Sequence, residues 1–249
     1  MKLSVSGWPG GGSSALSLIL CKMLGVKYIY GSNTFRYLYK TLSFGDSGEG
    51  RVDAHNYIEP YFGPVYDKYI DLVITKEDNF LIESDIAAFR VGKQKGFFSI
   101  FLITDQEVRK ERMGKDNRSD DAETIESVDE SHKEMYSKLH GIRWFDLDQI
   151  KETHAFVLDN NKLSIAEELQ AIFQEMHAQG LIDQEQMTDL VQRSEAEEKE
   201  FWENGKKYYQ EYLKEHGQVM SVDEILHEIS SKFSDEVNEM PEELKSLIK

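Results

Sequence analysis

The segment that most constrains the fold lies near the start of the chain, where a short apolar stretch runs into a cluster of glycines. Residues 3–6 have the composition of a buried strand, and residues 7–14 read Gly-Trp-Pro-Gly-Gly-Gly-Ser-Ser. An apolar helical stretch follows at residues 15–24. A strand, a glycine-rich turn and a helix in immediate succession bring several backbone N–H groups and the positive end of a helix dipole to one point.

This turn has the pattern of a phosphate-binding loop. Gly7 and Gly12 have the spacing of G-x-x-x-x-G-K-[ST], and Ser14 stands where the hydroxyl that holds Mg²⁺ is expected. The lysine position holds a serine instead, so the match is incomplete. We predict that phosphate binds to Gly7, Gly10, Gly11, Gly12, Ser13 and Ser14. The alternative is an ordinary glycine-rich turn whose serines cap a helix.

Composition excludes several classes of function. The 249 residues contain no run of about 18 apolar residues and no signal-peptide pattern, so we expect a cytoplasmic protein without a membrane span. A single cysteine fits a reducing compartment, and the seven histidines show no spacing typical of a zinc site. The net charge of −17 argues against non-specific binding to nucleic acid or to an anionic membrane.

Short apolar strands alternate with helical stretches up to about residue 176. The strands are expected at residues 3–6, 27–30, 80–83, 97–103 and 155–158, and the helices at 14–24, 33–41, 65–74, 106–113, 122–139 and 165–176. This alternation predicts an α/β, three-layer P-loop NTPase fold with a parallel five-stranded sheet. The loops that follow the first four strands should then meet at the carboxyl edge of the sheet, where ligands bind in such folds.

The pattern changes near residues 177–180, where Gly180 is a plausible helix stop. Beyond it only helical patterns remain, and residues 180–249 hold 18 Asp and Glu against 8 Lys and Arg. We therefore divide the chain into a domain of residues 1–178 and an acidic helical extension of residues 179–249.

The first of these segments resembles the cytidylate kinases, P-loop nucleoside monophosphate kinases that act on CMP and dCMP, and especially their shorter archaeal-type branch. The similar stretches, in the family's order, are SGWPGGGSSALSLILCKMLGVKYIYGSNTFR (6–36), VYDKYIDLVITKEDNFLIESDIAAF (65–89), IFLITDQEVRKERM (100–113) and HAFVLDNNKLSIAEELQAIF (154–173). The resemblance implies transfer of the ATP γ-phosphoryl group to CMP or dCMP, with Mg²⁺ held at Ser14.

The resemblance also implies site residues in the acceptor and lid regions. Arg36 stands where the first arginine for the CMP phosphate is expected, although it also reads as a solvated helix arginine. Ser32 either lies at the rim of the acceptor pocket or caps a helix. Arg112 and Arg118 are the candidates for lid cations.

Two departures weaken the catalytic resemblance. The family has an arginine in the loop after the third strand, whereas this chain has Ser84 and Asp85; either Asp85 replaces the arginine or Ser84 does, with Asp85 as the neighbouring acidic residue. Arg90 is a candidate substitute. The lid helix, residues 123–135, contains five acidic residues, Lys133 and no arginine. Two readings remain open: a diverged kinase, or a nucleotide-binding pseudoenzyme that acts as an interaction module.

The extension carries its own pattern. An aromatic-rich helical stretch beginning near residue 190 is interrupted at Gly205 and should end at Gly217, and a shorter amphipathic stretch follows. Its apolar faces either pack on the first domain or form a surface for a protein partner or for self-association.

Overall fold

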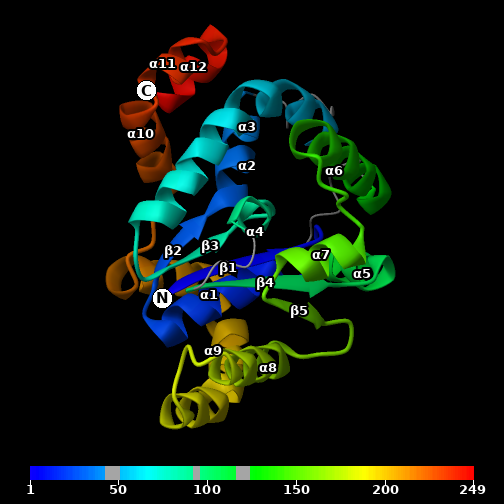
Figure 1. Cartoon of the computed structure of the whole chain (residues 1–249), viewed down its shortest axis with the longest axis vertical. Coiled ribbons are helices and arrows are strands. Elements are labelled where there is room, and N and C mark those ends of the chain that lie inside the picture. Colours follow the sequence, from blue (N-terminus) through cyan, green and yellow to red (C-terminus); the bar gives the residue numbers. More distant parts are fainter. Residues whose placement is uncertain (43–50, 92–95, 116–123) are drawn as a thin grey trace.

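The computed structural model describes residues 1–42, 51–91, 96–115 and 124–249 (Figure 1). Its five strands form one parallel sheet in the order β2-β3-β1-β4-β5. Their bounds are β1 Lys2–Gly7, β2 Lys27–Tyr30, β3 Phe80–Glu83, β4 Phe97–Ile103 and β5 Phe156–Asp159. Each lies within one residue of its predicted position. The central strands are buried on both faces, which explains their nearly continuous apolar sequences.

Helices cover both faces of the sheet. They are α1 Ser13–Leu24, α2 Gly31–Thr41, α3 Arg51–Lys76, α4 Ala87–Val91, α5 Gln106–Lys115, α6 Ile125–His140, α7 Leu147–Thr153, α8 Ile165–Ala178, α9 Gln184–His216, α10 Val222–Lys232, α11 Ser234–Asn238 and α12 Glu242–Ile248. One core cluster joins α1, α8 and α9 to the sheet, and a second joins α2, α3 and the last three helices to its other face. Figure 1 shows α8 and α9 below the sheet and α3 above it. The predicted three-layer α/β fold is confirmed.

One helix is much longer than expected. The sequence indicates a helix at residues 65–74, whereas α3 begins at Arg51 and contains Pro60 and Pro64. Proline lacks an N–H donor and usually ends a helix, so the pattern before residue 65 reads as non-helical. Among the described residues, every helix is too short or too polar to cross a bilayer.

Residues 179–249 contribute to both core clusters. Helix α8 ends at Ala178, and Gly180 has the positive φ of a helix-stop glycine, 72°. Helix α9 packs along α1 and α8. The backbone N–H of Met220 then donates to the carbonyl of Tyr28 in β2 at 3.1 Å. The following helices pack on α2 and α3. The division at residue 178 remains a proposal.

Lys22 of α1 anchors α9 to the first segment. Its Nζ lies 2.7 Å from carboxylate oxygens of both Glu197 and Glu200, and it also faces the rings of Tyr209 and Tyr212 at 4.7 and 5.1 Å. The Lys22 and Glu197 side chains are 9% and 11% exposed. Because a charge at this depth needs its partner, this contact fixes the position of α9 along α1.

We predict that Lys22→Met lowers the free energy of unfolding by about 3 kcal/mol, because it leaves the buried Glu197 without its cation. Chemical denaturation measures the loss. Lys199→Met, which removes an exposed ion pair on the same helix, is the control and should change stability by about 0.5 kcal/mol or less. Equal losses in the two variants would contradict the anchoring role of Lys22.

Candidate phosphate-binding site

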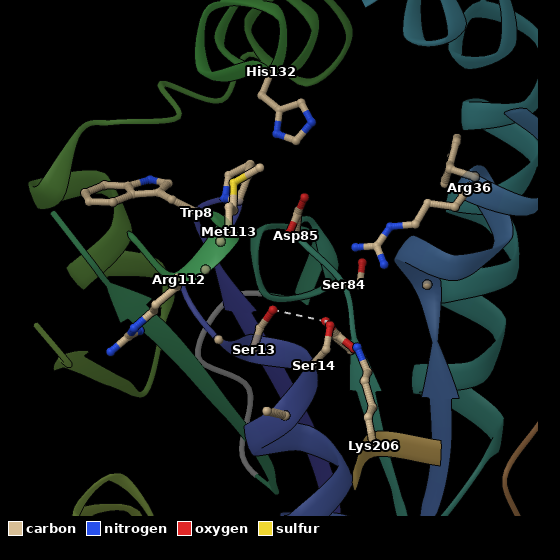
Figure 2. Close-up of a pocket in the computed structure, with 18 of the residues that line it drawn as sticks. Trp8, Ser13, Ser14, Arg36, Ser84, Asp85, Arg112, Met113, His132 and Lys206 are labelled. Atoms are coloured by element: carbon tan, nitrogen blue, oxygen red, sulfur yellow. Dashed lines mark hydrogen bonds between the residues drawn. The ribbon is translucent and has the colours of Figure 1, made fainter. Parts of the chain in front are cut away.

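A cavity of about 720 Å³ opens at the carboxyl edge of the sheet (Figure 2). Its walls come from the loop after β1, the start of α2, α3, the end of β3, α5, α6, the start of α8 and the middle of α9. This size falls in the usual range for ligand pockets. The three sequence-predicted regions that meet here are the glycine-rich loop, the start of α2 and the loop after β3.

The glycine-rich loop leaves the start of α1 open. Gly10 and Gly12 have φ of 82° and 99°, a region that favours glycine. Gly12 is the N-cap of α1, and no side chain accepts a hydrogen bond there. The amides at the helix start are therefore available to an anion, and the alternative in which Ser13 and Ser14 cap the helix does not fit the geometry.

Both serine hydroxyls point instead at Glu83, the last residue of β3. The Oε1 atom of Glu83 accepts from Ser14 at 2.6 Å and from Ser13 at 3.0 Å, while Oε2 accepts from the Tyr28 hydroxyl at 2.5 Å. Glu83 is 3% exposed. Sequence reasoning missed its role, although an acidic residue at the end of a buried strand was a usable signal.

Ser14 and Glu83 together offer hard oxygen ligands. Mg²⁺ typically takes one or two protein oxygens and completes its shell with phosphate and water. No group of three or more His, Cys, Asp or Glu side chains that could hold a metal occurs in the described part of the chain. The residues therefore fit Mg²⁺ bound together with a phosphate, rather than a metal held by protein alone.

Arg36 connects the opposite wall to the loop. Its Nη1 donates to the Tyr30 hydroxyl at 3.2 Å, and that hydroxyl lies 3.1 Å from Ser14 Oγ. Figure 2 shows the Arg36 guanidinium extending from α2 toward Ser84. Ser32 is the second residue of α2, and its side chain lies outside the described part of the structure.

The wall beside Arg36 is acidic and buried. Asp85 accepts a hydrogen bond from the Tyr136 hydroxyl at 3.0 Å. Burial, together with the charges of Asp67 and Asp85, raises the pKa of Glu59 to about 8. Burial also raises the pKa of Asp67 to about 6, against the opposing effect of Arg90. Within the described residues, the Asp67 Oδ1 atom and the hydroxyl of Tyr66 are buried without a hydrogen-bond partner, which favours a polar ligand here.

The lid cations occupy different environments. Arg112 lines the cavity but donates to the carbonyls of Gly11 and Asn160 at 2.8 and 3.0 Å. Figure 2 shows it on the other side of Ser13 from Arg36. Arg118 lies outside the described residues. Arg90 contacts Asp67 and Asp71 of α3 and does not line the cavity, so the structure does not support it as a substitute arginine.

Arg109 of α5 is buried and engaged by a carboxylate of α6. It is 3% exposed and forms two hydrogen bonds of 2.8 and 2.7 Å to the carboxylate of Asp129 on α6. Further ion pairs join Glu126 to Lys110 and Glu130 to Lys133. The acidic helix is thus partly neutralised, which the sequence pattern alone does not reveal.

We predict that Glu59→Gln reduces the loss of stability at alkaline pH. Because its pKa is raised from 4.5 to about 8, folded Glu59 keeps a proton that the unfolded chain loses in this window, so the free energy of unfolding falls as the pH rises. The variant should match wild type near pH 4.5 and exceed it at pH 8 by on the order of a few kcal/mol.

Denaturation curves across this pH range measure the difference. Glu195→Gln, at an exposed position of α9, should follow the wild-type profile. If the free energy of unfolding of Glu59→Gln changed with pH in the same way as that of wild type, the raised pKa of Glu59 would be contradicted.

Comparison with known proteins gives a consistent family. No family model matches the chain. Cytidylate kinase of Sulfolobus acidocaldarius is 32% identical over 154 residues, which cover 59% of this chain and 80% of that protein. The cytidylate kinase of Sulfurisphaera tokodaii is 28% identical, over 59% of this chain and 81% of its own length. The cytidylate kinase of Pyrobaculum neutrophilum is 27% identical, over 66% of this chain and 85% of its own length.

Solved structures show weaker overall similarity. An uncharacterized protein from Eubacterium ventriosum has a TM-score of 0.48 at 12% identity, covering 72% of this chain and 99% of that one. Shikimate kinase from Bacteroides thetaiotaomicron has a TM-score of 0.42 at 13% identity, covering 78% of this chain and 95% of that one. At these scores neither bears on the function. On the strength of its sequence identity to the Sulfolobus enzyme over most of that enzyme's length, this chain belongs to the cytidylate kinase family.

Proposed function

We propose that this protein is a nucleoside monophosphate kinase that transfers the γ-phosphoryl group of ATP to CMP or dCMP. The observation that carries the proposal is that one cavity has two chemically different ends, one suited to the donor phosphates and one to the acceptor nucleotide. One end is the open start of α1 with Ser14 and Glu83, and the other is Arg36 with the acidic wall around Asp85. The naming of the three relatives as cytidylate kinases supports the substrate class.

The donor phosphates occupy the glycine-rich loop in this proposal. The amides of Gly10 and of residues 12–14 and the dipole of α1 bind the phosphate oxygens of ATP, whereas the Gly11 amide donates to the Trp8 carbonyl at 2.8 Å. Ser14 and Glu83 hold Mg²⁺, which when bound neutralises charge on those oxygens. Ser13 and Tyr28 hold the Glu83 carboxylate in place.

The acceptor nucleotide occupies the other end. Arg36 presents a planar guanidinium that suits a phosphate dianion. A carboxylate recognises cytosine by accepting from its exocyclic amine, so Asp85 is a suitable reader of the base. The unpartnered Tyr66 hydroxyl and Asp67 oxygen supply further polar contacts.

The reaction needs no nucleophilic side chain. An oxygen of the CMP phosphate attacks the γ-phosphorus of ATP, a new P–O bond forms, and the bond from the γ-phosphorus to the bridging β-oxygen breaks. The products are CDP and ADP. The protein accelerates this step by aligning the two nucleotides and by placing cations around the transferring group.

A second candidate is a nucleotide-binding pseudoenzyme. It is favoured by the absence of an arginine from the loop between β3 and α4, residues 84–86, and by the engagement of Arg109 with Asp129. Arg112 is likewise held by two backbone carbonyls. A missing arginine finger costs a factor of ~10³ or more in phosphoryl transfer. A protein of this kind would bind ATP and turn over none of the monophosphates.

A coupled assay with purified protein, ATP, Mg²⁺ and each nucleoside monophosphate tests these candidates. We expect turnover confined to CMP and dCMP. Arg36→Ala should lower kcat/KM for CMP by about 100-fold, because a charged hydrogen bond to the acceptor phosphate is lost. Lys40→Ala, at an exposed position of the same helix, should behave as wild type. No turnover of any monophosphate by a protein that still binds ATP would favour the pseudoenzyme.

A further inference from the structure

The glycine-rich loop lacks the cation that usually reaches the donor phosphates. The lysine position holds Ser13, whose hydroxyl donates to Glu83. A P-loop lysine contacts the β- and γ-phosphates, which carry most of the charge of ATP. The donor end of the cavity therefore needs a positive charge from another element.

Helix α9 supplies a lysine to this end. Its helical backbone breaks at Gly205, which has φ 76° and ψ 166°, a combination that is essentially restricted to glycine. The next residue, Lys206, lines the cavity. Figure 2 shows its side chain rising from α9 with the amine pointing toward Ser14. Its Nζ lies 5.8 Å from the ring centroid of Tyr30, whose hydroxyl contacts Ser14.

Lys206 is half-buried and joins none of the ion pairs found in the described part of the protein. Two other lysines of α9 do pair along the helix, Lys199 with Glu203 and Lys207 with Glu211. A half-buried amine beside a phosphate-binding loop is better stabilised by an anion than by partial hydration alone. The lack of an ion-pair partner for Lys206 among the described residues thus favours a role in binding an anionic ligand.

The charge balance of the cavity strengthens this assignment. Among the described residues, its walls contain six carboxyl groups and three cationic side chains, namely Glu59, Asp67, Glu83, Asp85, Glu168 and Glu198 against Arg36, Arg112 and Lys206. Arg36 serves the acceptor end, and the guanidinium of Arg112 is held by two carbonyls. Of the three cations that line the cavity in the described part of the chain, Lys206 is therefore the one placed to meet the donor phosphates.

The segment of α9 just before Gly205 and Lys206 is tied to neighbouring helices. The carboxylate of Glu198 accepts from the backbone N–H groups of Ile165 and Ala166 at the start of α8, at 3.3 and 3.0 Å. Within two residues of Glu198 along α9, Glu197 and Glu200 bind Lys22 of α1. The segment before the break at Gly205 is thus tied to both helices that border the loop.

We propose that Lys206 binds the β- and γ-phosphates of ATP in place of the lysine absent at position 13, so that the C-terminal extension completes the nucleotide site. This proposal rests on the proposed function, because it assumes that ATP occupies the glycine-rich loop. It assigns the extension a part in substrate binding in addition to its part in the core.

Calorimetric titration of the full chain with Mg²⁺–ATP, and separately with CMP, tests the proposal without relying on turnover. Lys206→Met keeps the apolar stem and removes the charge, and should weaken ATP binding by about 10- to 100-fold. CMP affinity should stay unchanged. Lys206→Arg should retain most of the ATP affinity, and Lys199→Met, which lies outside the cavity, should match wild type.

A second variant separates charge from packing. Adding Ser13→Lys to Lys206→Met returns a cation to the loop and should restore ATP affinity toward the wild-type value. Unchanged ATP affinity in Lys206→Met overturns the proposal, as does an equal loss of ATP and CMP affinity that Ser13→Lys does not restore. Wild-type binding of ATP without turnover of any monophosphate would refute the kinase function and leave the assignment of Lys206 standing. Absence of ATP binding by wild type would refute both.

Discussion

The carboxylate of Glu83 is the contact on which the site depends. A buried carboxylate is costly unless hydrogen bonds compensate for its lost hydration. Here three hydroxyls do so, from Ser13 and Ser14 at the start of α1 and from Tyr28 of β2. Because β3 lies beside β2 in the sheet, this one group ties the start of α1 to both β3 and β2. It also keeps the serine hydroxyls away from the α1 amides, which remain available to a phosphate.

The distribution of charge bears on whether so acidic a chain is suited to the anionic nucleotide of the proposed function. The chain has 46 Asp and Glu residues, and six of those described line the cavity. The carboxylates on α6 are compensated in part by Arg109 and lysines. Within the acceptor wall, burial raises the pKa of Glu59 to about 8, so this group is largely uncharged near neutral pH. Repulsion of a phosphate is therefore weaker than the count of acidic residues suggests.

Much of the fold could be predicted from the sequence because it depends on local patterns. The strands follow from short apolar runs, the loop from its glycines, and the break and end of α9 from Gly205 and Gly217. The early start of α3 could not be predicted, since Pro60 and Pro64 read as helix breakers. The roles of Glu83, Arg109 and Lys206 depend on contacts between residues far apart in the chain, such as Arg109 with Asp129, and no local pattern encodes these.

The central claim is that the open start of α1 binds the phosphates of ATP. Calorimetric titration of ATP into Gly12→Asp tests it most directly, because this change places a carboxylate at the N-cap and strains a residue with φ of 99°. Gly25→Asp is the matched control, since Gly25 ends the same helix with φ of 62° and open space around it. We expect Gly12→Asp to lose ATP binding and Gly25→Asp to retain it. Equal ATP affinity in Gly12→Asp and wild type would contradict the account.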